Sequence, residues 1–220
     1  MTTSTGRRER RKRETRHQLG DVAARLFAEH GYDAVSVSDV ARAAGVAEQT
    51  VYNYFPTKPD LVLDRADEIL ARTRQAVAER RAHEVPADAL RALVHEDVAR
   101  YVADDGDLAR GEFPAQSQQS PVLRRRALEY YDDLAEAITS ALAEAAPAPP
   151  RLVHRAHAAA LVAVVQATTT GIGAAVLSGA DREDAARRLL RDADAALDHA
   201  ASWSRVEVEA TTPATEDTTS

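Results

Sequence analysis

Residues 48–54 offer a compact group of side chains that could form hydrogen bonds from one side of a short helix. The group is short or rigid and mostly uncharged, and it comprises Gln49, Thr50, Tyr52, Asn53 and Tyr54. Val51 and Phe55 are four residues apart, so both would face inward. A helix with such an outer face suits the major groove of DNA, where base edges and phosphates must both be met.

A second short helix is predicted just before it. Ser36 and Asp39 have the spacing of a capping box, which starts a helix. An apolar stripe then follows at helical spacing, formed by Val37, Val40, Ala41 and Ala44. Gly45 is suited to ending the helix because glycine enters left-handed backbone angles at little cost. This pattern alone leaves an ordinary helical hairpin as an alternative.

The continuation Thr50-Val51-Tyr52-Asn53-Tyr54-Phe55-x-x-Lys58 resembles the TetR family of bacterial transcriptional regulators, over about residues 14–65. The resemblance implies a helix-turn-helix that binds double-stranded operator DNA through Ser36, Val37, Ser38, Ala47, Glu48, Gln49, Thr50, Tyr52, Asn53, Tyr54 and Lys58. Ala47 departs from the family, which often has a capping Ser there. Glu48 places a negative charge where phosphates approach, so the base preference stays open.

The composition narrows the classes of protein that the chain can belong to. Of its 220 residues 45% are hydrophobic, which is enough for a sizeable core, and the absence of Cys excludes disulfides and thiolate metal sites. Residues 1–58 hold ten basic and seven acidic side chains, net +3, so the remainder of this −7 chain carries −10. A basic head on an acidic body is typical of a DNA-binding domain attached to a regulatory domain.

The patterning predicts an all-α fold of about nine helices, with no strand-like alternation. We expect a three-helix helix-turn-helix domain at 14–60 and a helical ligand-binding and dimerisation domain at 61–203. Basic residues 1–13 and polar residues 204–220 are expected to be disordered. Thr57 and Asp60 predict a further helix start, and the resemblance implies that the long helix after it transmits the ligand signal.

The last two long helices are predicted at about 152–178 and 182–202. Residues 156–176 are apolar enough to suggest a membrane span, but Gln166 and three consecutive threonines favour a helix buried on several sides. A stripe with small residues follows in the last helix: Leu189, Leu190, Ala193, Ala196, Leu197 and Ala200. Two such helices per chain predict a homodimer with a four-helix interface and no membrane partner.

The ligand pocket is less evident from the sequence. The resemblance places it in the second domain, where candidates are polar or aromatic residues on apolar faces: Tyr101, Phe113, Tyr130, Tyr131, Gln166 and Thr169. His154 and His157 could share a metal, but no third ligand is evident and surface or interface positions are favoured. We expect no metal, no cofactor and no catalysis.

These observations favour a ligand-responsive transcriptional regulator, a repressor that leaves its operator when an unidentified small molecule binds. No N-terminal apolar run is present, so the cytoplasm is the expected location. One alternative is a helical small-molecule-binding protein or enzyme with a vestigial head. Another is an architectural DNA binder with little sequence preference.

Overall fold

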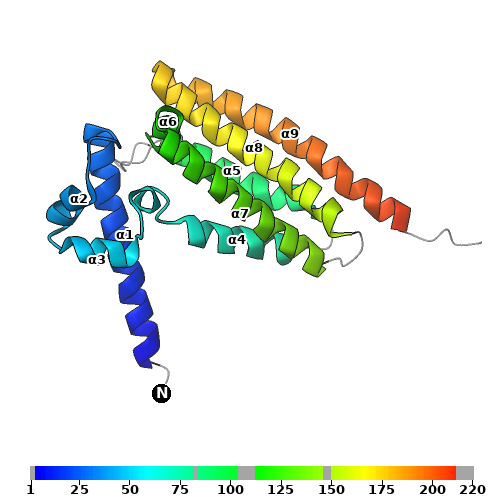
Figure 1. The fold of residues 1–220 in the computed structure, drawn as a ribbon. Coiled ribbons are helices and arrows are strands. Elements are labelled where there is room, and N and C mark those ends of the chain that lie inside the picture. The colour runs from blue at the N-terminus through cyan, green and yellow to red at the C-terminus, as the bar shows by residue number, and fades with distance from the viewer. Residues whose placement is uncertain (1–2, 82–83, 104–111, 146–149, 212–220) are drawn as a thin grey trace, which may run out of the picture.

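The computed structural model describes residues 3–81, 84–103, 112–145 and 150–211, and within these it contains helices and no strand. The helices form a small head and a larger body (Figure 1). The head holds α1 (Thr3–His30), α2 (Val37–Ala44), α3 (Glu48–Tyr54) and the 3-10 helix η1 (Lys58–Leu61). The body holds α4 (Ala66–Ala78), α5 (Pro86–Val102), α6 (Glu112–Gln119), α7 (Pro121–Ala145), α8 (Arg151–Ser178) and α9 (Arg182–Thr211). The predicted all-α, two-domain fold is confirmed.

Local signals explain the boundaries of α2. The Ser36 hydroxyl accepts from the Asp39 backbone N–H at 3.1 Å, and the Asp39 carboxylate accepts from the Ser36 N–H at 2.9 Å. Gly45 ends the helix at φ 69°, in the left-handed region that favours glycine. Ala47 makes no side-chain cap to α3, as its type dictates.

The head has its own apolar core, built where one stripe of α1 meets α2 and α3. Its fully buried members include Leu19, Ala23, Val40, Val51 and Phe55. One further member, Leu123, comes from α7 in the body and is 0% exposed. The two parts of the fold therefore share packing at their junction.

The body is a layered bundle in which α9 lies along α5 and α8, and α7 lies between α4 and α8 (Figure 1). Its main core combines residues from five helices: Val77, Leu90, Leu134, Ile138, Leu161 and Leu197. Each of these is at most 2% exposed, so the core depends on contacts between residues far apart in the sequence.

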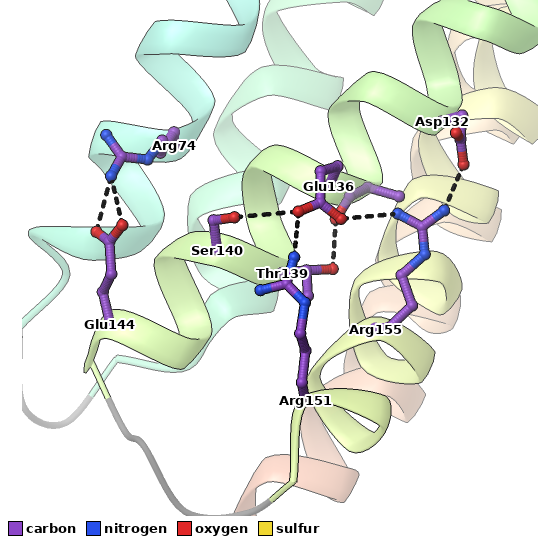
Figure 2. Close-up of polar contacts among 9 residues, drawn as sticks. Arg74, Asp132, Glu136, Thr139, Ser140, Glu144, Arg151 and Arg155 are labelled. Atoms are coloured by element: carbon purple, nitrogen blue, oxygen red, sulfur yellow. Dashed lines mark hydrogen bonds and ion pairs between the residues drawn. The ribbon is translucent and has the colours of Figure 1, made fainter.

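Ion pairs join α4, α7 and α8 at the end of the body that lies far from the head in Figure 1, and Figure 2 shows them in close-up. Arg74 of α4 donates to both oxygens of Glu144 of α7, at 2.7 and 2.8 Å. Glu136 of α7 accepts from Arg151 and faces Arg155, both on α8. Because these side chains are about half exposed, each pair contributes at most about 1 kcal/mol.

Several predictions of order and burial differ from the structure. The basic segment expected to be disordered is helical from Thr3, as a continuation of α1, and α9 continues to Thr211, while residues 212–220 lie outside the described part. The helix expected after Asp60 is interrupted, because η1 ends at Leu61 and α4 begins at Ala66. His154 and His157 are buried, at 6% and 7% exposure, and are not surface residues.

The stripe of α9 that was predicted to form the dimer interface is partly buried within its own chain and partly exposed. Leu197, Ala193 and Ala200 lie in the core of their own chain, whereas Ala196 is exposed. The helical period places these residues on one side of α9, but the stripe cannot tell whether its neighbour belongs to the same chain. Leu197 therefore stabilises the body itself.

One helix of the described residues, α8, is long and apolar enough to cross a membrane by length and composition. A third of its most apolar window is buried within the chain, against α6, α7 and α9. Its exposed residues recur every three or four positions and form what we call the outer face of α8: Leu152, Ala156, Ala159, Ala163, Ala167, Thr170, Ala174 and Leu177. Small residues dominate this face.

The Leu197→Ala substitution should lower the free energy of unfolding by about 2–5 kcal/mol, because it leaves a cavity in a packed core. Leu128→Ala is the matched control, since Leu128 of α7 is 52% exposed and should change stability by less than about 0.5 kcal/mol. Urea denaturation followed by circular dichroism measures both. Equal effects of the two substitutions would contradict the placement of Leu197.

Candidate nucleic-acid interface and ligand cavity

The outer face of α3 presents the side chains that the sequence analysis selected for contact with bases. Glu48, Gln49 and Asn53 are exposed, and Tyr52 is 41% exposed although it is a large aromatic residue. Gln49 Nε2 donates to Asn53 Oδ1 at 3.3 Å, which aligns the two amides one turn apart. Thr50 and Tyr54 are half-buried at the edges of this face.

The residues at the start of α2 differ in what they could offer to a partner. Ser38 and Ser36 are exposed, but the Ser36 hydroxyl is engaged in the cap. Val37 is 8% exposed and belongs to the head core, so its side chain is not available at the surface. Hydrogen bonds from Ser36 hold the pKa of Asp39 below its usual value, so Asp39 stays charged at the first turn.

Lys58 is turned toward the interior of the head. Its Nζ donates to the Tyr32 carbonyl at 2.6 Å and lies 4.1 Å from the centre of the Tyr32 ring. Burial lowers the pKa of Lys58, while Asp33 opposes the shift. To reach a phosphate, this side chain has to leave the Tyr32 carbonyl.

Arg16 is a central residue of the site that the sequence analysis did not select. Its guanidinium donates to the Tyr54 carbonyl at 2.6 Å and to the Asp64 carbonyl at 3.0 Å, and it lies 4.4 Å from the centre of the Phe55 ring. It thus joins α1 to the end of α3 and to the segment leading into α4. Nothing local in the sequence marks it, because its partners are 38 and 48 residues away.

Basic side chains extend from the head along the N-terminal part of α1. Arg7, Arg8, Arg11 and Arg13 are exposed there, and Arg10 pairs with Glu14 at 3.1 Å. A rigid row of arginines can lie along a phosphate backbone, which binds cations without sequence preference.

A cavity of about 590 Å³ lies between the head and the body. This volume is within the usual range for small-molecule sites. Of the predicted ligand residues, Tyr101, Tyr130, Tyr131 and Thr169 line it, whereas Gln166 does not. The side chain of Phe113 lies outside the described residues. The cavity also reaches α1 and η1 in the head, which the sequence analysis did not anticipate.

The cavity wall is mostly aliphatic and aromatic, but it also includes charged side chains: Asp21, Arg25, Asp64, Arg65, Arg72, Asp97 and Arg100. Asp97 of α5 pairs with Arg100, and Arg72 of α4 pairs with Glu96 at 2.9 Å. Burial raises the pKa of Asp97 and that of Tyr130, and the two neighbouring guanidinium groups oppose both shifts. The charges in this wall are therefore largely compensated by their own partners.

Two hydroxyls in the residues lining the cavity have no hydrogen-bond partner within the described chain. They belong to Thr73, which is 0% exposed, and to Tyr101. An unpaired buried polar group costs about 1–3 kcal/mol, so the native core is locally destabilised here. Buried polar groups are usually paired, so these two hydroxyls are sites where a bound molecule could supply a partner.

The fold and the exposed face of α3 define a helix-turn-helix protein with a separate helical domain. Residues 19–64 match the family described as bacterial regulatory proteins, tetR family. The helix-turn-helix part of the chain is therefore of the kind found in this family.

Relatives and solved structures agree with this assignment. The chain is 32% identical over 124 residues to the HTH-type transcriptional repressor AcnR of Corynebacterium glutamicum, covering 56% of this chain and 62% of the relative. It is 32% identical over 100 residues to the fatty acid metabolism regulator protein of Bacillus subtilis, covering 46% and 52%. The matched stretches thus span less than two thirds of these curated relatives.

The fold itself is similar to that of the crystal structure of the transcriptional regulator FadR from Bacillus subtilis in complex with stearoyl-CoA. That comparison gives a TM-score of 0.55 at 22% identity and covers 84% of this chain and 97% of the other. At this identity the likeness concerns the fold.

Arg16→Leu should lower the free energy of unfolding by about 1.5–3 kcal/mol, because two charge-assisted hydrogen bonds to backbone carbonyls are lost. Arg13→Leu, on the exposed surface of the same helix, serves as the control and should be nearly neutral. Thermal unfolding at fixed salt measures both. If Arg16→Leu is as stable as Arg13→Leu, the contacts of Arg16 do not hold the head together.

Proposed function

We propose that this protein is a homodimeric, ligand-responsive DNA-binding repressor that leaves its operator when a small molecule binds. The observation that carries the proposal is the exposed polar face of α3 within the segment that matches the TetR family. A helix of this kind places three or four side chains against base edges in the major groove. Gln49 and Asn53 are suited to bases, since amides pair with adenine in two places at once.

The remaining predicted DNA contacts surround this face. Tyr52, Thr50 and Tyr54 offer hydroxyls to phosphates or base edges, and Ser38 is exposed at the start of α2. The arginines of α1 add attraction to phosphates that is independent of sequence and weakens with salt. The net charge of +3 over residues 1–58 supports phosphate contacts that position the head on DNA, while the side chains of α3 recognise the bases.

The dimer is proposed to form through α8 and α9. The outer face of α8 is the support, since its alanines allow two helices to approach closely while Leu152 and Leu177 add apolar area. On α9 the exposed residues include the small Ala195, Ala196 and Ser202, beside charged ones such as Asp192. Two copies of such a pair make a four-helix interface around a two-fold axis.

The effector is proposed to be a small, largely apolar molecule held in the cavity. The apolar walls and the internally paired charges favour this class over a strongly charged one. The solved FadR structure of B. subtilis holds stearoyl-CoA, whose acyl chain is apolar although its CoA group is charged, and the C. glutamicum relative is named a repressor. A ligand lowers DNA affinity only by the amount by which it prefers the conformer that binds DNA poorly.

The alternatives have less support. The relatives are regulators, and among the described residues no group of three or more potential metal ligands occurs. A vestigial head need not keep an exposed aromatic residue such as Tyr52 beside two aligned amides. We propose that the protein acts in the cytoplasm, where its DNA would be.

Tyr52→Ala should weaken binding to the DNA upstream of the protein's own coding sequence by about five- to a hundredfold, because a lost base or phosphate contact costs about 1–3 kcal/mol. Leu128→Ala, an exposed residue of the body, is the control. Fluorescence anisotropy at fixed salt gives the dissociation constants, and random DNA of equal length gives the specificity. Unchanged affinity in a folded Tyr52→Ala protein would remove α3 from the interface, and equal affinity for both DNAs would favour the architectural alternative.

Ala163→Arg should split the dimer, because two like charges would meet near the two-fold axis in an apolar seam. Ala99→Arg places the same substitution at an exposed position of α5 and should leave assembly intact. Sedimentation velocity at micromolar concentration measures the oligomeric state. A dimer that survives Ala163→Arg has its interface elsewhere.

A further inference from the structure

One wall of the cavity belongs to the DNA-binding domain itself. Gly20, Ala24 and Phe27 of α1 line it, together with Leu61 of η1. The opposite walls come from α4, α5, α7 and α8 of the body. Any molecule that fills this cavity therefore touches both domains. On the head side it meets an apolar patch at Ala24, Phe27 and Leu61, which is flanked by the charged Asp21 and Arg25 of α1.

A hydrogen bond between the body and the head lies at the edge of the same cavity. Gln116 of α6 lines the cavity, and its Nε2 donates to the Phe27 carbonyl at 2.9 Å. That carbonyl lies in the last turn of α1, where it also accepts from the Gly31 N–H at 2.9 Å. The bond spans 89 residues, so it reports directly on how the head sits against the body.

A second brace lies on the α7 side. Arg126 pairs with Asp60 of η1 at 3.1 Å, and Asp60 at the same time caps the Thr57 N–H at 3.0 Å. Arg126 adjoins Ala127, which lines the cavity, and Leu123 one turn earlier is buried in the head core. Both braces therefore start at residues that either line the cavity or lie next to one that does.

We propose that the effector binds between the domains, with an apolar part directly against α1, and that the Gln116–Phe27 hydrogen bond transmits its presence to the head. This inference rests on the proposed ligand response and locates the effector site across both domains. Close-packed walls change between discrete arrangements rather than yielding gradually, so a molecule wedged against Ala24 favours a conformer in which α1 is displaced from α6. Gln116 acts as a positioning residue because it holds α1 in the arrangement that binds DNA.

Ala24→Trp tests the proposal by filling the head side of the cavity with an apolar side chain. We expect about a tenfold or larger rise in the dissociation constant for the protein's own upstream DNA, within the range of ordinary allosteric coupling. Ala28→Trp, one turn along α1 at an exposed position, should change it less than twofold. Ala24→Leu is the milder substitution if the Trp variant unfolds. Equal effects at Ala24 and Ala28, or none at Ala24 in a folded protein, would overturn the proposal.

The role of Gln116 is tested by repeating Ala24→Trp in two backgrounds. Gln116→Leu removes the bond to the head, whereas Gln118→Leu removes a bond of the same kind, from Gln118 Nε2 to the Thr170 carbonyl within the body, at 2.8 Å. In the Gln116→Leu background the effect of Ala24→Trp should shrink to less than about threefold, while the Gln118→Leu background keeps it in full. The same effect in both backgrounds would show that Gln116 does not transmit the signal.

Hydrogen exchange separates this inference from the proposed function. Ala24→Trp and Gln116→Leu should each speed amide exchange in the last turn of α1, with or without DNA, relative to Ala28→Trp and Gln118→Leu. Faster exchange in a protein that does not prefer its upstream DNA would support an effector site that couples the two domains, and it would refute the proposed sequence-specific regulator. Unchanged exchange would refute the coupling between the cavity and α1, even if DNA binding is specific.

Discussion

The guanidinium of Arg16 fixes the position of α3 relative to α1 and to the segment that leads into α4. It binds the carbonyl at the end of α3 and the carbonyl just before α4, and it covers the Phe55 ring. The Tyr54 carbonyl is one of the acceptors that a helix leaves unpaired at its end, so a permanently charged donor is a strong partner there. Arg16 therefore links the segment before α4 to the end of α3.

Two glycines allow close approaches between elements, one within the body and one where the head meets α4. A Cβ at Gly173 of α8 would lie 2.5 Å from the Pro114 carbonyl, so α6 and α8 touch through their backbones. At Gly20 of α1 a Cβ would lie 2.6 Å from the Asp64 carboxylate, beside the entry to α4. A continuous path of packed residues thus runs from α8, through α6 and Gln116, to the last turn of α1. In the proposed dimer, α8 lies at the two-fold axis, so this path would join the axis to each head.

The sequence predicted those features that depend on neighbours along the chain. The capping box of Ser36 and Asp39, the left-handed Gly45 and the uncapped start at Ala47 are all local, and the structure has each of them. The head core and most of the helix positions follow from period alone. The positions of the DNA-contact residues on α3 are consistent with their predicted role, which stays a prediction.

What the sequence could not give depends on partners far along the chain. Arg16, Gln116 and Leu123 are ordinary residues until folding brings them to the junction. An apolar period says which side of a helix is covered but not by which chain, so Leu197 was assigned to a dimer when it packs in its own core. Arginine-rich residues 1–13 look disordered by composition, yet the helix of α1 extends through them to Thr3.

In the proposed complex, two α3 helices enter successive major grooves on one side of DNA. Hydroxyl-radical footprinting of the dimer on the DNA upstream of its own coding sequence tests it most directly. The account predicts two protected segments on one face, about 10 base pairs apart from centre to centre or a multiple of that. Uniform protection, or a single protected segment at saturating protein, would contradict it.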